Sequence, residues 1–490
     1  MAAKGSLRTS LTHPLEIAAV TAGAGMGRVG LTFCPGKTQL HAATGAWQRS
    51  LDLDLARIAD WAAAVVVTLL ESHELTTLGV EALGEAVVRE HLEWVHLPIT
   101  DGGVPDPRFE AGWQVWGPGL RSQLRQGFDV LVHCKGGLGR AGTVACRLLV
   151  DCGWSAADAL AAVRAARPGA VENSLQERHV LSLNPLAEAK PLTSAAAIED
   201  RGIGALLGLA VGDAVGTTLE FSRRDAVPAI TDLIGGGPFR LIAGEWTDDT
   251  AMTLALADSL AVDPELDEAD LMRRFVSWYR DGDYSCTGRC FDIGVTTREA
   301  LTRFERTGDP LAGSPDPQAA GNGSLMRLAP VAIRHWRDRA RLNDIAERQS
   351  RTTHAATEAV HACIGYANIL ADAIAGEPRD AVLAPQAASF TPKVKAVLEG
   401  GWRGKPRGAI ASSGYVVHSL EAALWCVGRT HDFRSAVLLA ANLGDDADTT
   451  AAITGQLAGA LYGANGIPAR WLERLAWRER LVTAARSLIA

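Results

Sequence analysis

The sequence predicts two domains: an α/β domain with a parallel-rich central sheet and flanking helices, followed by an all-helical domain. The chain has 490 residues, which is more than one ordinary hydrophobic core accommodates. Short β-like segments alternate with helical patterns up to about residue 183, whereas long helical patterns and glycine-rich turns follow from residue 198. We therefore expect domains at 1–183 and 198–490, joined by a Pro- and Ala-containing linker at 184–197.

Three short apolar segments predict strands in the first domain, because β-branched and aromatic residues gather in them. They lie at 61–71, 94–100 and 128–134, and amphipathic patterns at 142–154 and 156–167 predict helices. Strands that alternate with helices are typical of a mainly parallel sheet covered on both faces. The second domain has almost no alternating strand pattern, so we expect helices throughout.

The composition limits the classes of function. A net charge of −8 gives no support for a protein that holds nucleic acid through phosphate contacts. The eight cysteines are scattered and form no Cys-x2-Cys pair, which predicts reduced thiols and a cytoplasmic location. The first 20 residues make a poor signal peptide, because polar residues interrupt every apolar run.

One apolar segment, at 203–219, has glycine at every fourth position from Gly204 to Gly216. This spacing also occurs in packed membrane helices. The segment is shorter than about 20 residues and contains Asp213, so we favour a buried helix of a globular domain over a membrane span.

A glycine-rich loop in the first domain has the features of a phosphate site. A predicted buried strand ends at Cys134, and Arg140 follows five residues later at the start of a predicted helix. Glycines let successive backbone N–H groups surround an oxyanion, and the helix start adds its positive dipole end. An arginine can bind two phosphoryl oxygens at once, and this field favours a nucleophilic thiolate at Cys134. The residues expected to bind phosphate are Lys135, Gly136, Gly137, Leu138, Gly139 and Arg140.

This loop resembles the Cys-x5-Arg signature of the protein tyrosine/dual-specificity phosphatases. His133 also matches, and the segment LPITDGGVPD at 97–106 is similar to the acid loop of kinase-associated phosphatases. The resemblance implies a cysteine-phosphatase fold, a phosphocysteine intermediate and no cofactor. It also implies that Asp101 is the general acid and that Gln176 positions water.

The loop departs from the family at Ala141, where most members carry Ser or Thr. The missing hydroxyl predicts slow turnover, unless Thr143 replaces it. A phosphate-binding domain with weak catalysis therefore stays open as an alternative, as does a plain strand–helix turn with a buried cysteine.

Two acidic segments of the second domain have the same arrangement of residues. EWTDDTA at 245–251 and NLGDDADTTAAI at 442–453 each place carboxylates and threonine hydroxyls at the start of a helix. One such segment alone is usually a helix cap. Two that converge would repel each other unless cations lay between them, and oxygen ligands suit Mg²⁺, Mn²⁺ or Ca²⁺.

These segments, together with GIGALLGLAVGDAVGTTLEF at 202–221 and GNGSLMR at 321–327, resemble ADP-ribosylglycohydrolases of the dinitrogenase-reductase-activating type, in the same order. The resemblance implies two divalent cations, Mg²⁺ or alternatively Mn²⁺. The implied metal ligands are Thr247, Asp248, Asp249, Asp446, Asp448 and Thr449, while the role of Asp445 is open. Glu220 is the implied catalytic acid or base, and the implied substrate-binding residues are Asp292, Gly323, Ser324, His354 and Tyr415.

Together the two resemblances predict a bifunctional hydrolase that removes α-linked ADP-ribose from a protein or small molecule and hydrolyses a phosphomonoester. One substrate carrying both groups would explain the fusion, since linkage raises the effective concentration of a shared intermediate. An ADP-ribosylated or phosphorylated nucleic-acid end stays open as a substrate, and no membrane partner is expected. The non-enzymatic alternative is a module that only binds ADP-ribose and phosphate.

Overall fold

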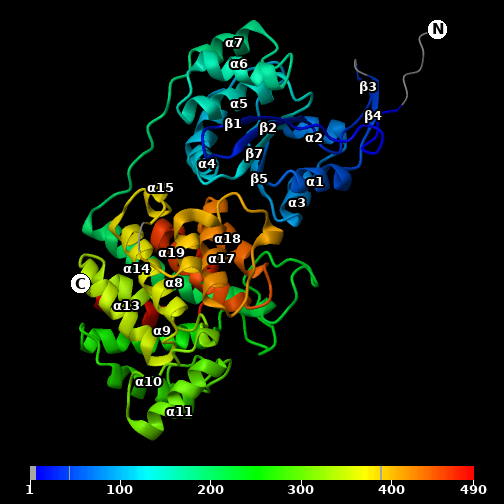
Figure 1. Cartoon of the computed structure of the whole chain (residues 1–490). Helices are drawn as coiled ribbons and strands as arrows, with labels where there is room; N and C mark the ends of the chain where they lie inside the picture. Colours follow the sequence, from blue (N-terminus) through cyan, green and yellow to red (C-terminus); the bar gives the residue numbers. More distant parts are fainter. Residues whose placement is uncertain (1–6, 43–44, 387–388, 490) are drawn as a thin grey trace, which may run out of the picture. The chain divides into compact units, whose positions relative to one another are not determined.

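The computed structural model describes residues 7–42, 45–386 and 389–489, which form two compact units (Figure 1). The first unit consists of the described part of Met1–Ala189 with the short segments Arg403–Pro406 and Arg429–His431. The second consists of the described parts of Lys190–Trp402, Arg407–Gly428 and Asp432–Ala490. The predicted fold class is confirmed: an α/β unit with a mixed sheet precedes an all-helical one.

The first unit is built on a five-stranded sheet in the order β1-β2-β7-β5-β6. Its strands are β1 (Ala18–Thr21), β2 (Arg28–Phe33), β5 (Ala63–Thr68), β6 (Glu93–His96) and β7 (Asp129–Cys134). β1 pairs antiparallel with β2, and the other neighbours are parallel. Because parallel strands end at the same edge, the register places Cys134 of β7 opposite Phe33 of β2. A separate two-stranded sheet joins β3 (Thr38–Ala42) to β4 (Gly45–Gln48).

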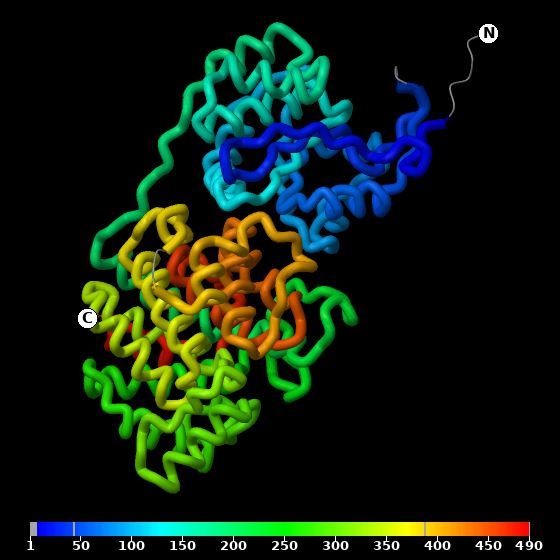
Figure 2. The backbone as a smooth tube through the Cα atoms, viewed as in Figure 1, coloured from blue at the N-terminus to red at the C-terminus, as the bar shows by residue number. Residues whose placement is uncertain are grey.

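Helices cover both faces of this sheet, as the tube in Figure 2 also shows. They are α1 (Leu51–Asp60), α2 (Ser72–Leu78), α3 (Leu83–Arg89), α4 (Pro107–Arg125), α5 (Gly139–Asp151), α6 (Ala156–Ala166) and α7 (Ser174–Leu181). One buried core contains side chains of α4, α5 and α6, and the other contains side chains of α1, α2 and α3. Val65 and Val67 point into the first core and Val66 into the second, which is the alternation expected of a strand covered on both sides.

The strands predicted within 61–71, 94–100 and 128–134 are confirmed, and α5 and α6 correspond to the two predicted helices. β1, β2 and the β3–β4 pair are not predicted by the sequence patterns. These strands lie near the N-terminus, where β2 carries Gly30 and interrupts its apolar run with Thr32.

The second unit is helical throughout its described residues, apart from isolated β-bridges. Its α-helices are α8 (Ala195–Gly216), α9 (Asp248–Val262), α10 (Glu268–Asp281), α11 (Val295–Thr307), α12 (Ala329–His335), α13 (Arg339–Thr353), α14 (Thr357–Ala375), α15 (Arg379–Val382), α16 (Pro392–Ala396), α17 (Val416–Arg429), α18 (Phe433–Ala441), α19 (Ala447–Tyr462), α20 (Ala469–Arg474) and α21 (Arg478–Ile489). The site described below lies at the C-terminal end of α8 and the starts of α9 and α19.

The regularly spaced glycines of α8 let this helix contact α19 backbone to backbone. A Cβ added at Gly208 would lie 2.2 Å from the carbonyl oxygen of Gly455, and one at Gly216 would lie 2.3 Å from that of Ala447. Only glycine permits this approach, and it brings the C-terminal end of α8 beside the start of α19. The segment Ala195–Leu219 is long and apolar enough to cross a membrane by length and composition, but 94% of its apolar window is buried, as expected for a core helix.

Candidate active sites

The first site lies where β7 runs into α5. Cys134 is the last residue of β7, and the backbone N–H of Gly137 donates a hydrogen bond to its Sγ at 3.3 Å. Gly137 has φ +71°, and a Cβ there would lie 2.5 Å from the backbone of Thr32. Glycine is therefore required at this position, because any side chain would push the loop away from β2. The result is a loop whose amide points at the sulfur.

Arg140 is fixed over this loop by a carboxylate that the sequence did not reveal. Its two terminal nitrogens donate to the Oε2 and Oε1 of Glu74 in α2, at 2.6 and 2.9 Å, and Nη1 also donates to the carbonyl of Ile99 at 2.9 Å. Burial alone would raise the pKa of Glu74, but hydrogen bonds from Arg140 and the backbone, together with the charges of Arg140 and Lys135, leave that pKa lowered. Such a bidentate pair sets the plane of the guanidinium.

Asp101 also reaches Arg140: its Oδ1 lies 2.9 Å from Nη2, and its side chain is 62% exposed. The predicted acid, nucleophile and arginine are thus brought together, with Asp101 on the solvent side. Gln176 is buried and connects the acid loop to the phosphate loop, since its Nε2 donates to the carbonyl of Gly103 at 3.1 Å and lies beside Gly139.

Two other predicted residues face inward. His133 is fully buried, with Nε2 2.8 Å from the hydroxyl of Thr68, and burial lowers its pKa to about 3. It is therefore a neutral residue of the core at physiological pH. The Thr143 hydroxyl donates to the carbonyl of Gly139 at 3.0 Å within its own helix, so it does not take the place of the hydroxyl missing at Ala141.

A buried lysine lies behind the phosphate loop. The Nζ of Lys37 donates to the carbonyl of Lys135 at 3.2 Å and lies 4.9 and 4.7 Å from the ring centres of Phe33 and Trp47. Only 5% of Lys37 is exposed, and burial lowers its pKa to about 8. Cys34 and Cys134 are among the charged groups that act on Lys37, and no ion pair joins Lys37 to a carboxylate of the described residues. Lys37 is thus a buried cation close to the nucleophile.

The second site is a group of carboxylates at helix ends, which we call the carboxylate cluster. Oxygens of Asp213, Asp249 and Asp448 lie within 4.8 Å of one another, and so do oxygens of Glu220, Asp446 and Asp448. They come from the end of α8, the start of α9, the turn after α8 and the start of α19. The close packing of α8 on α19 is what brings them together.

Backbone and hydroxyl donors hold these carboxylates in place. Asp213 accepts hydrogen bonds from the N–H and hydroxyl groups of both Thr247 and Thr250, at 2.6 to 3.0 Å. The Oε2 of Glu220 accepts from the N–H groups of Ala447 and Asp448, at 2.8 and 3.2 Å, at the positive end of α19.

The remaining predicted metal ligands lie in the same place. The Thr449 hydroxyl lies 3.4 Å from Asp249 Oδ2, and the Nδ2 of Asn322 donates to Asp446 at 2.5 Å. Burial and then the charge of Asp448 raise the pKa of Asp248 well above its ordinary value. Thr247, Asp248, Asp249, Asp446, Asp448 and Thr449 therefore gather at one point in the fold.

The cluster carries more negative charge than the protein neutralises. Burial, reinforced by the Asp448 charge, raises the pKa of both Asp213 and Asp446 to about 7. Two buried oxygens, Asp249 Oδ1 and Asp448 Oδ2, have no hydrogen-bond partner. Unpartnered carboxylate oxygens beside threonine hydroxyls are a donor set for hard divalent cations, so the residues fit the ions that the resemblance implies.

The predicted substrate residues divide into two groups. Asp292 joins the cluster, since burial and then the charges of Asp248 and Asp448 raise its pKa to about 11. Tyr415 pairs in an isolated bridge with Gly321, and its hydroxyl donates to Glu358.

The other three face the interior. Ser324 is fully buried and accepts a hydrogen bond from the Ser350 hydroxyl at 2.8 Å. His354 is buried with its Nδ1 2.8 Å from the Thr353 hydroxyl, and burial lowers its pKa to about 3. A Cβ on Gly323 would lie 2.7 Å from the His354 ring, so this glycine lets the loop pack against the histidine.

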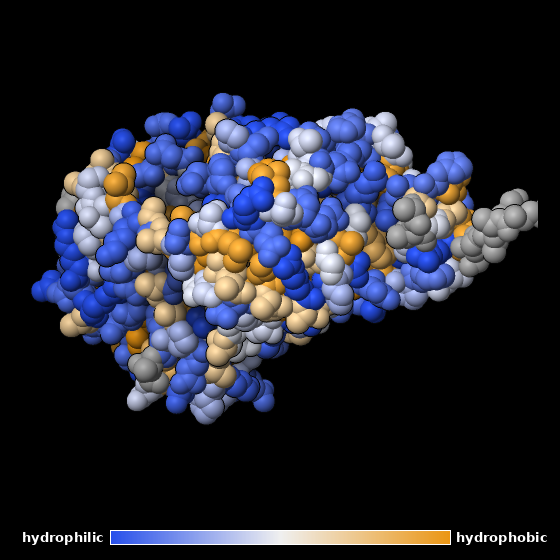
Figure 3. Space-filling view, turned by 90° about the horizontal axis from the view of Figure 1, so that it is seen from above, coloured by the Kyte–Doolittle hydropathy of each residue, from blue (hydrophilic) through white to orange (hydrophobic). Residues whose placement is uncertain are grey.

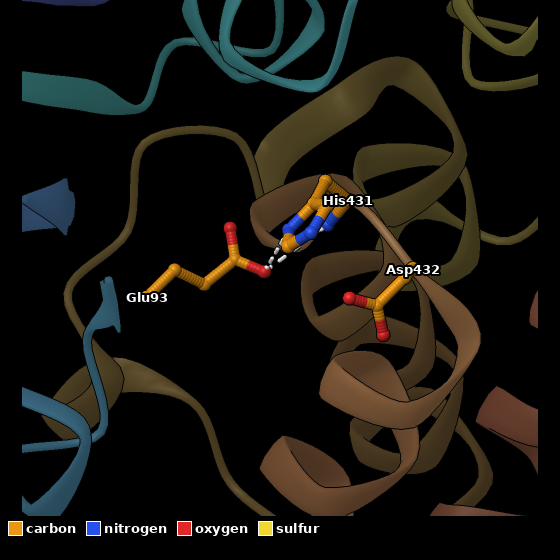
Figure 4. A group of neighbouring side chains, drawn as sticks. All are labelled: Glu93, His431 and Asp432. Carbon is orange, nitrogen blue, oxygen red and sulfur yellow. Dashed lines mark hydrogen bonds and ion pairs between the residues drawn. The ribbon is translucent and has the colours of Figure 1, made fainter. Parts of the chain in front are cut away.

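A third group of polar side chains consists of Glu93, His431 and Asp432 (Figure 4). The Nδ1 of His431 lies 2.6 Å from an oxygen of Glu93, and both residues belong to the first unit. Asp432 caps α18 by accepting a hydrogen bond from the N–H of Ser435 at 2.7 Å. Since these carboxylates are already bound by protein donors, we assign the group no catalytic role.

Comparison with known proteins identifies both units. The family described as ADP-ribosylglycohydrolase matches residues 194–490. The chain belongs to the ADP-ribosylglycohydrolase family. The family described as "Swiss Army Knife protein, DSP-PTPase phosphatase domain" matches residues 47–180. The protein is therefore an enzyme with a glycohydrolase domain and a phosphatase domain.

Individual relatives cover the glycohydrolase domain. The ADP-ribosylarginine hydrolase Tri1 of Pseudomonas putida is 50% identical over 59% of this chain and 78% of its own length. The ADP-ribosyl-[dinitrogen reductase] glycohydrolase of Rhodospirillum rubrum is 34% identical over 57% of this chain and 91% of its own. A solved structure titled "ADP-ribosylglycohydrolase-related protein complex" is 43% identical, covers 60% of this chain and 98% of its own, and has a TM-score of 0.54. The likeness to kinase-associated phosphatases stays a prediction.

Proposed function

We propose that the second domain releases ADP-ribose from arginine side chains, in a reaction that depends on two divalent cations. The carboxylate cluster carries this proposal, because its two unpartnered oxygens and its raised pKa values leave a buried negative charge for cations to neutralise. The arginine acceptor is suggested by the name of the Pseudomonas putida relative, an ADP-ribosylarginine hydrolase.

In this proposal Thr247, Asp248, Asp249, Asp446, Asp448 and Thr449 hold Mg²⁺, with Mn²⁺ as the alternative. When bound, the cations supply positive charge that orients the ribose hydroxyls and a water molecule. Glu220 orients or deprotonates that water, because its Oε2 is fixed by two N–H groups at the start of α19 and its carboxyl lies against Asp448. The surrounding carboxylates stabilise positive charge that develops on the ribose, so no covalent nucleophile is required.

For the first domain we propose hydrolysis of a phosphomonoester with Cys134 as nucleophile, Arg140 as phosphate ligand and Asp101 as general acid. The amide–sulfur contact and the Asp101–Arg140 pair support these roles. We further propose that breakdown of the phosphocysteine is slow, since Ala141 has no hydroxyl and Thr143 is bonded to its own helix.

The decisive experiment measures ADP-ribose release from arginine-linked, serine-linked and small-molecule-linked substrates, with Mg²⁺ and with chelator. Wild type is compared with Asp446→Ala and with Cys134→Ser, which leaves the second site intact. We expect Mg²⁺-dependent release that Asp446→Ala abolishes and Cys134→Ser preserves. Tight ADP-ribose binding without release from any substrate would instead identify a binding module.

We also propose that the two sites share one substrate that carries both a phosphate and an ADP-ribosyl group. Linkage in one chain raises the local concentration of an intermediate passed between the sites. Cys134→Ser tests this, because it should slow ADP-ribose release from a phosphorylated substrate and not from the unphosphorylated one. Equal release from both substrates would refute the idea.

A further inference from the structure

Three phenylalanine side chains form a row in the second unit. None of them has a role in the two sites described above. The ring centres of Phe221 and Phe239 are 6.2 Å apart with the rings nearly perpendicular, and those of Phe239 and Phe291 are 5.2 Å apart. Phe221 is 67% exposed, and the other two are half-buried. We call these three residues the aromatic row.

Two residues of the aromatic row are adjacent in sequence to carboxylates at the carboxylate cluster. Phe221 directly follows Glu220, and Phe291 directly precedes Asp292. Carboxyl oxygens of Glu220 and Asp448 lie within 4.8 Å of each other, and the charge of Asp448 also acts on the carboxyl of Asp292. The two ends of the row are therefore anchored one residue away from carboxyls that meet at the same point.

The exposure of Phe221 is imposed by the backbone. Its N–H donates to the carbonyl of Asp445 at 2.8 Å, and the N–H of Asp445 donates to the carbonyl of Ser222 at 2.7 Å. Phe221, Asp445 and Asp292 all have φ near +60°, which side-chain-bearing residues rarely adopt. Strain of this kind clusters where the surrounding structure holds a residue for function, and here it turns an aromatic ring outward beside the site.

Exposed apolar side chains carry meaning when they gather at one place. The surface face in Figure 3 shows apolar residues among mostly polar ones, and single exposed residues there need no explanation. A row of three rings bordering a group of carboxylates is different, because it combines flat aromatic faces with nearby negative charge. That combination suits a planar, delocalised cation.

We infer that Phe221, Phe239 and Phe291 form the acceptor subsite, which binds the guanidinium group of ADP-ribosylated arginine. This inference rests on the proposed arginine acceptor. The acceptor nitrogen leaves from the anomeric carbon, so it must lie on the open side of the carboxylate cluster, where Phe221 is exposed. A serine oxygen or an acetyl acceptor would gain nothing from stacking on these rings.

The test replaces each ring by leucine, which keeps an apolar side chain and removes the aromatic face. For Phe221→Leu, Phe239→Leu and Phe291→Leu we expect kcat/KM for ADP-ribosylarginine to fall about two- to fivefold per ring. Inhibition by free ADP-ribose, which has no guanidinium, should stay unchanged. Phe221→Trp keeps an aromatic face, so its kcat/KM should match or exceed the wild-type value. Phe304→Leu, on α11, is the matched control and should leave kcat/KM unchanged.

The outcomes separate this inference from the proposed function. If wild type does not cleave ADP-ribosylarginine, both the proposed acceptor and this subsite are wrong. If wild type cleaves it but the leucine variants match wild type, only the subsite is wrong. A parallel loss of ADP-ribose inhibition would place the rings on the ADP-ribose half of the substrate and also overturn the inference.

Discussion

We predict that Mg²⁺ binding to the carboxylate cluster releases protons near neutral pH. The pKa values of Asp213 and Asp446 are raised to about 7, so at pH 7 each carboxyl is about half protonated and the pair holds about one proton. A cation between them favours the ionised forms, so its binding should release about one proton from these two groups. Asp248 and Asp249, whose pKa values lie higher, add to this number.

The same shifts fix how stability depends on pH when cations are removed. A carboxyl whose folded pKa lies above its unfolded value favours the folded state at low pH, and this contribution is lost as the pH rises through the folded pKa. A rise from 3.8 to about 7 corresponds to about 4 kcal/mol for one such group. In chelator, the second domain should therefore be less stable at pH 8 than at pH 5, and Mg²⁺ should restore its stability at pH 8.

Calorimetric titration with Mg²⁺ in buffers of different ionisation enthalpy counts the released protons, and thermal unfolding with and without chelator follows stability. Asp446→Asn should bind Mg²⁺ more weakly and release fewer protons. A binding heat that does not depend on the buffer at pH 6 to 7 would refute this account. So would a chelated protein whose stability rises from pH 5 to pH 8.

Three further predictions address single residues. Cys134→Ser should lower phosphomonoester hydrolysis at least about a thousandfold and leave ADP-ribose release from unphosphorylated substrates unchanged, since only the first site loses its nucleophile. A phosphatase assay showing a smaller loss would assign the nucleophile elsewhere. Lys37→Met should slow alkylation of Cys134 at neutral pH, because it removes the buried cation behind the loop, whereas Lys37→Arg should keep the wild-type rate. An equal loss in both variants would show that charge is not the cause. Gly208→Ala should lower the free energy of unfolding by about 3 kcal/mol, because its Cβ would lie 2.2 Å from the Gly455 carbonyl oxygen. A chemical denaturation curve that matches wild type would contradict this packing.

Short-range patterns explain which parts of the fold could be predicted. β7 and α5 were evident because a buried apolar strand, a glycine loop and an amphipathic helix follow one another directly. β1 and β2 lack such a pattern. β2 pairs with β7, about 100 residues later in the chain, and β1 joins the sheet through β2. Sequence spacing also revealed the every-fourth glycines of α8, but not that they allow contact with α19.

The site residues that the sequence reveals are also those that lie in local motifs. Residues in local motifs, such as Arg140 and Asp448, could be named from the sequence. Glu74 and Asp213 could not, because each is a single carboxylate within an ordinary helical pattern and gains its partners through tertiary contacts. For Asp213 a signal was present: one acidic residue in a long apolar segment must be hydrogen-bonded or paired when it is buried.

Each of the two sites contains buried charge that neighbouring protein groups do not neutralise. Among the described residues, the ammonium of Lys37 at the first site has no carboxylate in an ion pair with it, and buried oxygens of Asp249 and Asp448 at the second site accept no hydrogen bond. A buried charge without a partner costs stability, so it persists where a ligand of opposite charge completes it. The sign of the missing charge therefore indicates the ligand: an anion such as a phosphoryl group at the first site, and cations at the second.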